Sequence, residues 1–349
     1  MEDFTRRDFI KGVVGAGISL VAADSFASET ISSLAMSMDD NPYQAKGLPL
    51  TELGSTGVLI PKIVLGLGSR FCHIEEEDES NEMLNYALDN GLYYWDTAHV
   101  YDNTIAIPPG KTKSPKHIIS EVRVGEVVKY RRKEIFLSTK VTARDPSEAM
   151  KEIEDSLKKL NTDKLDMLKI HSVASIEDVD EMSKKGHMID LLHKLKEEGV
   201  TRFIGFSGHG DAYALKEMAN RSDFDSMLIA MNHYTPKKPS PREDVSISAG
   251  VNKKMGVLLM KAVRPKELIP GLQAPDLVRY AMSLDGPDAV VVGMDSKAVV
   301  DSNLEILRNF KKLSPERMKE LAIKLEPFYR HENLPWMQHG YVDGNWTKA

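Results

Sequence analysis

Residues 134–171 read EIFLSTKVTARDPSEAMKEIEDSLKKLNTDKLDMLKIH, and this stretch decides the fold. EIFLSTK and KLDMLKIH are apolar runs with the length of buried strands. The segment between them begins with Pro146 and Ser147, which are typical of a helix start. It carries an apolar stripe on one helical face: Met150, Ile153, Leu157 and Leu160. A strand, a helix and a strand in this order predict two parallel strands joined by a covering helix.

The same alternation continues in both directions, from about residue 46 to about residue 312. Before it, GSTG at 54–57 supplies the glycines of a hairpin turn. The strand-like runs are KIVLGLG, LYYWD, EIFLSTK, KLDMLKIH, TRFIGFSGH, FDSMLIAMNHY, GVLLMKAV and DAVVVGM. Eight such units in roughly 250 residues predict an α/β fold, a (β/α)8 TIM barrel with an N-terminal β-hairpin and a C-terminal helical extension. A doubly wound sheet is the rival fold, but it lacks its G-x-G-x-x-G turn here.

Composition narrows the functional classes. The 349 residues include 46 basic and 52 acidic side chains, a net charge of −6 without long runs of one sign. We therefore expect no nucleic-acid partner. Cys72 is the single cysteine of the sequence, which excludes an intramolecular disulfide and every cysteine-rich metal motif. Redox chemistry would thus require another cofactor.

The first residues have the pattern of an export signal. TRRDFIKG, residues 5–12, precedes the apolar run VVGAGISLVAA and resembles the twin-arginine (Tat) consensus. We predict a Tat signal peptide at 1–27, a linker at 28–45, and a barrel domain at 46–349 whose extension begins at about 313. The resemblance implies the Tat export machinery as a partner and a periplasmic or otherwise exported protein. The apolar run is too short to span a bilayer stably. We therefore expect no stable membrane span after cleavage. A cytoplasmic amphipathic arm is the alternative.

Ionisable side chains follow three successive predicted strands. Asp96 ends the second strand, Tyr101 lies on the loop after it, Lys140 ends the third strand, and His171 ends the fourth. The carboxyl ends of barrel strands meet at one mouth, where TIM-barrel active sites lie. We therefore expect these four side chains to converge. His99, between Asp96 and Tyr101, is a further candidate for the substrate pocket.

These motifs resemble the aldo-keto reductase family over roughly residues 46–312. GLYYWDTAHVY matches the family's Asp and Tyr, FLSTK its Lys, and LDMLKIH its His. GVTRFIGFSG resembles the strand before its nicotinamide contacts, and VVVGMDSKAVVDSN resembles its adenosine-phosphate segment. The resemblance implies a nicotinamide cofactor, NADP or possibly NAD, and a small-molecule carbonyl substrate such as an aldehyde, ketone or sugar. The implied cofactor contacts are Ser207, Gly208, Asn232, Met260, Lys261, Gly293, Ser296, Lys297 and Asn303.

This chain departs from the family at three places. Met260 stands where many members have an aromatic ring, so the nicotinamide would contact a thioether. Asp295 lies near the implied site of a 2′-phosphate, with Lys297 as the evident counter-charge. The loop at 102–119 is longer than usual. NADP rather than NAD is therefore an expectation from the family and not from charge.

The residue types also suit carbonyl reduction directly. Reduction delivers a hydride to carbon and a proton to oxygen, and a free tyrosine with a pKa of about 10 holds its proton too tightly near neutral pH. A lysine cation beside Tyr101 would favour the phenolate, and Asp96 would hold that cation in place. His171 could donate to the substrate oxygen and orient it. Tyr101 is therefore the predicted proton donor.

Other functions remain open at this point. One is a redox-sensing or interaction protein of the same fold that retains its nucleotide and turns over slowly. A hydrolase would need two carboxylates or a metal at the mouth, and Asp96 is the one well-placed acid. His171, His209 and His233 lack a regular ligand spacing, so we expect no metal site.

Overall fold

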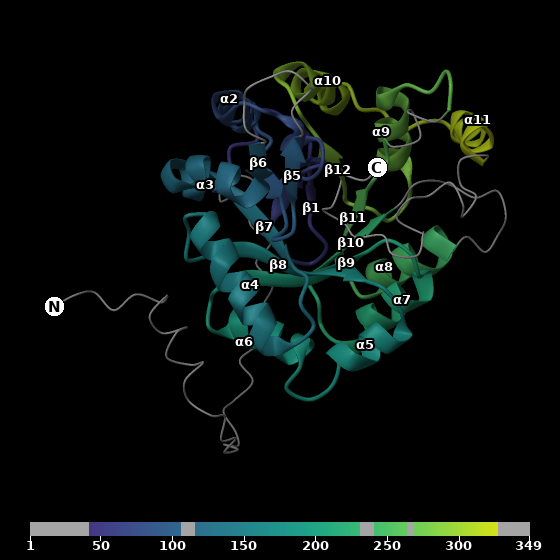
Figure 1. Cartoon of the computed structure of the whole chain (residues 1–349). Coiled ribbons are helices and arrows are strands. Elements are labelled where there is room, and N and C mark those ends of the chain that lie inside the picture. The colour runs from purple at the N-terminus through teal and green to yellow at the C-terminus, as the bar shows by residue number, and fades with distance from the viewer. Residues whose placement is uncertain (1–41, 106–115, 231–240, 264–268, 327–349) are drawn as a thin grey trace.

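The protein folds as a closed barrel of parallel strands surrounded by helices (Figure 1). The structure is a computed structural model, and it describes residues 42–105, 116–230, 241–263 and 269–326. The eight barrel strands pair in sequence order, and the last strand, β12, closes on the first, β3. This arrangement confirms the predicted (β/α)8 TIM barrel. The strands are β3 (Ile63–Gly66), β4 (Tyr94–Asp96), β7 (Phe136–Val141), β8 (Leu165–Val173), β9 (Thr201–Gly208), β10 (Ser226–Ala230), β11 (Gly256–Met260) and β12 (Ala289–Gly293).

Helices follow the strands and cover the outside of the barrel. They are α2 (Glu77–Asp89), α3 (Ser120–Arg131), α4 (Pro146–Lys159), α5 (Ile176–Met182), α6 (Met188–Glu197), α7 (Ala212–Arg221), α8 (Ser248–Asn252), α9 (Ala274–Ser283) and α10 (Lys297–Arg308). Short 3-10 turns lie at Phe71–His73 and Arg132–Glu134, and a π-helical turn lies at Pro241–Ile247. Local sequence sets the start of α4, because the Asp145 carboxylate accepts hydrogen bonds from the backbone N–H groups of Ser147 and Glu148. None of the helices in the described ranges combines the length and the apolar character needed to cross a bilayer.

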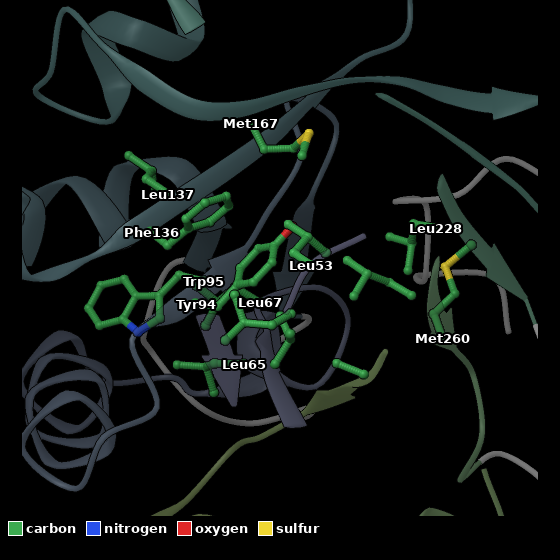
Figure 2. Close-up of a cluster of buried hydrophobic side chains, with 14 of the residues drawn as sticks. Leu53, Leu65, Leu67, Tyr94, Trp95, Phe136, Leu137, Met167, Leu228 and Met260 are labelled. Carbon is green, nitrogen blue, oxygen red and sulfur yellow. The ribbon is translucent and has the colours of Figure 1, made fainter. Parts of the chain in front are cut away.

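The barrel strands are buried on both faces, as parallel strands beneath helices must be. Tyr94 and Trp95 are both fully buried, and Figure 2 shows them projecting in opposite directions from β4. The Trp95 indole N–H donates to the carbonyl of Leu92 at 2.9 Å, so its polar atom is satisfied. Residues at every second position of a strand therefore face the barrel interior, where the functional side chains lie.

An N-terminal segment closes one end of the barrel. The predicted hairpin is present as β1 (Leu50–Glu52) and β2 (Leu59–Pro61). At its turn, a Cβ on Gly54 would lie 2.2 Å from the backbone nitrogen of Gly256, at the start of β11. Tyr43, within the predicted linker, is buried, and its hydroxyl donates to Asp166 near the start of β8. The segment thus covers the amino ends of the strands, opposite the predicted active-site mouth.

Two further elements extend the barrel. The 102–119 segment contains an antiparallel hairpin, β5 (Asp102–Ile105) and β6 (Lys116–Ile119), whose connecting residues 106–115 lie outside the described ranges. The predicted C-terminal extension is present as helix α11 (Pro315–Leu325). It packs with α9 and the chain before it through one apolar cluster: Leu272, Leu277, Tyr280, Leu321 and Leu325. The predicted signal peptide at 1–27, the linker up to residue 41 and the extension after residue 326 lie outside the described residues.

Candidate functional site

The structure brings Asp96, Lys140 and Tyr101 together at the carboxyl ends of β4 and β7. The Lys140 ammonium donates to Asp96 Oδ2 at 2.6 Å, to the Thr97 carbonyl at 2.7 Å and to the Tyr101 hydroxyl at 3.2 Å. It also lies 4.6 Å from the centre of the Tyr101 ring. Asp96 and Lys140 are almost completely buried, whereas Tyr101 keeps 7% of its surface exposed. A cation held by a buried carboxylate therefore touches the hydroxyl of a tyrosine that keeps a small exposed surface.

His171 completes the group from β8. Its ring centre lies 5.6 Å from that of Tyr101, with the two rings nearly perpendicular at 79°. The end of β8 is held by Arg144, whose guanidinium donates to the carbonyls of His171 and Ser172 at 2.9 and 3.1 Å. Asp178 pairs with the same guanidinium at 2.8 Å. These contacts fix the backbone that carries His171.

The neighbouring hairpin and the loop after β3 hold Tyr101 in place. Its side chain packs in a small apolar cluster with Cys72, Ala98 and Ile118. Its backbone carbonyl accepts from Ser120 N at 2.9 Å, and its backbone N–H donates to the Ala98 carbonyl at 3.0 Å. Packing and backbone hydrogen bonds therefore both restrict where the phenol can lie.

A second polar layer lies beneath this group. It consists of Tyr94, Ser138 and Lys169. The Lys169 ammonium donates to Asp96 Oδ1 at 2.9 Å, to Ser138 Oγ at 2.7 Å and to Tyr94 Oη at 3.2 Å. Ser138 in turn donates to Asp96 Oδ1 at 3.1 Å. Each of the three stands two residues before a predicted site residue, on the same face of its strand.

The two lysines decide the ionisation of Asp96. Burial disfavours the Asp96 carboxylate, but the adjacent ammonium groups of Lys140 and Lys169 outweigh burial and lower its pKa to about 2. Burial and the Asp96 carboxylate raise the pKa of Tyr94 well above its usual range. Asp96 is therefore ionised and Tyr94 neutral over the pH range in which most proteins function. Lys169 was not among the predicted site residues, although its position two residues before His171 was an available signal.

The predicted nicotinamide contacts lie at the carboxyl ends of β9 and β11. Ser207 is buried, and its hydroxyl accepts from Ser172 N at 3.0 Å. Gly208 ends β9, and a Cβ there would lie 2.3 Å from the Leu215 side chain. Met260 ends β11, and Lys261 follows it with a positive φ of 63°. The predicted Asn232 lies outside the described residues.

The predicted adenosine-phosphate segment joins β12 to α10. Gly293 ends the strand, and Ser296 caps the helix by accepting from Val299 N. Lys297 begins the helix. Asn303 is buried in its second turn, and its Oδ1 has no hydrogen-bond partner among the described residues.

A helix N-terminus at the mouth and a buried unpaired amide oxygen are the kinds of group that bind a phosphate and a nucleobase amine. The residues present therefore fit a dinucleotide.

Ion pairs surround this segment. Arg70, on the loop after β3, contacts Asp295 at 3.0 Å, and Lys297 contacts Glu82 on α2 at 2.8 Å. We expected Lys297 to be the counter-charge at the implied 2′-phosphate site, and the structure adds Arg70 as a second cation beside Asp295. The Arg70 contact was not predictable, because its partner lies 225 residues away.

His99 lies apart from the proton-donor group, whereas the His209 ring lies 6.4 Å from that of His171. The His99 imidazole contacts Ser156 on α4 at 3.2 Å and lies 3.9 Å from Glu121 on α3. It therefore faces the helices and not the substrate mouth. His209 Nδ1 lies 3.2 Å from the Ser172 hydroxyl, and His233 is outside the described residues. No group of three potential metal ligands is found within the described ranges.

Comparison with known proteins places this site in a family. The model of the aldo/keto reductase family matches residues 62–263, more than half of the chain. The chain belongs to the aldo/keto reductase family.

The individual relatives described below have sequence identities of 29% or less to this chain. The uncharacterized oxidoreductase YqkF of Bacillus subtilis (strain 168) is 29% identical over 195 residues, which cover 52% of this chain and 56% of YqkF. L-galactose dehydrogenase of Arabidopsis thaliana is 24% identical over 336 residues, covering 83% of this chain and 97% of that enzyme. The chain thus spans about half the length of YqkF and nearly all of the plant enzyme.

Solved structures agree on the fold. The holo form of the aldo-keto reductase AKR11C1 from Bacillus halodurans superposes with a TM-score of 0.61 at 21% identity, covering 79% of this chain and 96% of that chain. The superposition supports the shared barrel. A sequence identity of 21% is too low to indicate a shared substrate.

Proposed function

We propose that this protein transfers a hydride between a nicotinamide dinucleotide and a carbonyl or alcohol substrate, with Tyr101 as the proton donor. The observation that carries the proposal is the contact of the Lys140 ammonium with both Asp96 Oδ2 and the Tyr101 hydroxyl. Family membership supports the same reaction class. The similarity to L-galactose dehydrogenase makes sugars the first substrates to test, followed by simple aldehydes and ketones.

Each side chain has a distinct task in this proposal. The nicotinamide supplies or accepts the hydride when it is bound. Lys140 stabilises negative charge on the Tyr101 oxygen, so that the phenol gives up its proton to the substrate oxygen more readily. Asp96 keeps the ammonium in position, and His171 donates a hydrogen bond that orients the substrate oxygen. The buried lower half of the group excludes water and strengthens these electrostatic interactions.

We propose NADP as the cofactor, with NAD as the alternative. Ser207, Gly208, Met260 and Lys261 would lie around the nicotinamide, and Asn232 would assist them. At the other end, Gly293, Ser296, Lys297 and Asn303 would hold the adenosine phosphate. Charge favours neither dinucleotide, since the cations Arg70 and Lys297 are each paired with an acid.

The sequence TRRDFIKG at residues 5–12 supports export through the Tat pathway to the periplasm or beyond. That pathway moves folded proteins, so the barrel would acquire its nucleotide before export. A protein outside the cytoplasm has no evident supply of reduced nucleotide. We therefore propose that it retains the dinucleotide tightly.

Replacing Tyr101 by Phe tests the reaction. Loss of a general acid typically lowers turnover by about 10²- to 10⁴-fold, and nucleotide affinity should be nearly unchanged. Turnover would be measured with a panel of sugars, aldehydes and ketones, and nucleotide binding by fluorescence titration. Tyr130→Phe is the matched control, because Tyr130 is 78% exposed on α3. Equal turnover of the parent and the Tyr101→Phe variant would remove the proposed role.

A further inference from the structure

Lys169 is a fully buried lysine to which the proposed reaction assigns no task. It belongs to β8, and its register partner on β7 is Lys140. Two lysines side by side in a barrel interior are costly, because each ammonium loses its hydration. Such an arrangement calls for a compensating partner or a function.

The lysine has a built site around it. Three oxygen acceptors, from Asp96, Ser138 and Tyr94, lie within 3.2 Å of its ammonium. On the other side its register partner is Gly205 of β9. A Cβ on Gly205 would lie 2.3 Å from the Ser226 carbonyl but in ordinary contact, at 3.5 Å, with the Lys169 Cγ, so the glycine reflects the close approach of β10 and not the lysine stem. All three donor directions of the ammonium are thus occupied.

The charge balance of this group differs from that of a simple ion pair. Lys140 uses Asp96 Oδ2 and Lys169 uses Asp96 Oδ1, so a single carboxylate serves two ammonium groups. Burial lowers the pKa of Lys169, and the Asp96 carboxylate opposes this effect. With both lysines protonated, these three side chains together carry an excess of one positive charge. Without Lys169, the pair of Asp96 and Lys140 would be neutral overall.

This excess charge lies next to Tyr101. The titratable groups that surround Tyr101 come from every element packed around it: Asp96 and Tyr94 on β4, Lys140 on β7, Lys169 and His171 on β8, Cys72 before α2, and the Asp102–His117 pair on the β5–β6 hairpin. Burial raises the pKa of Cys72 to about 12, so this thiol stays neutral. Within the hydrogen-bonded group beneath the phenol, the charged side chains are therefore Asp96 and the two lysines, while the buried acid Glu121 on α3 bonds to Thr139 of β7.

We propose that Lys169 is a positioning residue that fixes Asp96 from below and, through its charge, favours the phenolate form of Tyr101. The inference rests on the proposed reductase function and adds a direction to it. A phenolate accepts a proton, so the second lysine favours oxidation of alcohols near neutral pH. In that direction the hydroxyl proton of the alcohol moves to the Tyr101 oxygen, and its C–H bond releases a hydride to the oxidised nicotinamide, leaving a carbonyl product.

The first test is a spectroscopic titration of Tyr101 that requires no substrate. The difference in ultraviolet absorbance between a protein and its Tyr101→Phe derivative reports phenolate formation at Tyr101 alone. Lys169→Met keeps the volume and removes the charge, and Lys169→Gln keeps a hydrogen-bond donor. At an effective dielectric constant of about 20, a unit charge roughly 10 Å away shifts an ionisation equilibrium by about one pH unit. Both variants should therefore raise the ionisation midpoint of Tyr101 by about one pH unit, a tenfold loss of phenolate at fixed pH.

Comparison with Lys140→Met calibrates the effect, since this lysine touches the phenol directly and should give a larger shift. Folded Lys169→Met and Lys169→Gln variants with an unchanged Tyr101 midpoint would overturn the inference. If neither variant folds, lysine NMR of the parent protein decides, because a neutral Lys169 at pH 7 would also overturn it. If no carbonyl or alcohol substrate is ever found, the titration still reports on Lys169, so failure of the proposed function is distinguishable from failure of this inference.

Discussion

Replacing Glu121 by Gln should make the protein resist alkaline destabilisation. Glu121 is fully buried on α3, where it accepts a hydrogen bond from Thr139, the residue next to Lys140 in β7. Burial raises its pKa from 4.5 to about 7, against the opposing effect of hydrogen bonds from Thr139 and Ser156. Between these two pH values the folded protein keeps a proton that the unfolded chain has released. Stability present below pH 4.5 is therefore lost as the pH rises to 7.

The magnitude follows from that difference. A difference of roughly 2.5 between the folded and unfolded pKa corresponds to about 3 kcal/mol, at about 1.4 kcal/mol per pKa unit. Most of this falls between pH 5 and 8, so this group should lower the free energy of unfolding by about 2 to 3 kcal/mol across that interval. The amide of Gln has no proton to lose. Urea unfolding of parent and variant at pH 5 and pH 8 would measure the difference.

The control is Glu126→Gln, a partly exposed glutamate on the same helix. It should change stability by a few tenths of a kcal/mol at either pH, as most surface substitutions do. Parent and Glu121→Gln proteins that lose stability in parallel between pH 5 and pH 8 would refute the reasoning. That result would mean that Glu121 ionises in the folded protein at an ordinary pH.

Two further predictions concern the nucleotide and export. Asp295→Asn removes the acid that pairs with Arg70 and should raise the affinity for NADP relative to NAD by about tenfold, because the released guanidinium can contact a 2′-phosphate. Asp301→Asn, on helix α10 after this loop, is the control, and an unchanged affinity ratio would contradict the assignment of this segment. Replacing Arg6 and Arg7 by Lys should retain the uncut protein in the cytoplasm, as judged by cell fractionation and N-terminal sequencing; equal export of both forms would argue against a twin-arginine signal.

The barrel itself was predictable from the sequence because strands and helices alternate with clear periodicity. Pro146 and the apolar stripe of α4 marked a helix that the structure contains. The packing of Tyr43 was not predictable, because it is one aromatic residue in a polar segment and its partner Asp166 lies 123 positions away. The β5–β6 hairpin was also missed, since the sequence of residues 106–115 carries no two-residue hairpin signal.

At the candidate site, the polar residue at the end of each strand could be recognised in the sequence as a site residue. The polar residues inside the same strands could not. Asp96, Lys140 and His171 attracted attention because they interrupt apolar runs at strand ends. Lys169 and Ser138 lie deeper in similar runs, where sequence alone does not distinguish an inward lysine from an exposed one. Counting back by two from each strand-end residue identifies both, since alternate residues of a strand share a face. Contacts such as Arg70 with Asp295 depend on the closure of the barrel and leave no local pattern.

The β5–β6 hairpin fixes the backbone at Tyr101 without using the residues that join its two strands. Its pairing begins at once, with Asp102 opposite Ile119, and Ser120 N then bonds back to the Tyr101 carbonyl. Residues inserted or deleted between 105 and 116 would lengthen or shorten the chain beyond this ladder, while the pairs that fix the phenol stay the same. The segment is therefore a suitable place for a combinatorial library, in which its length and sequence could vary while the position of the Tyr101 phenol is retained.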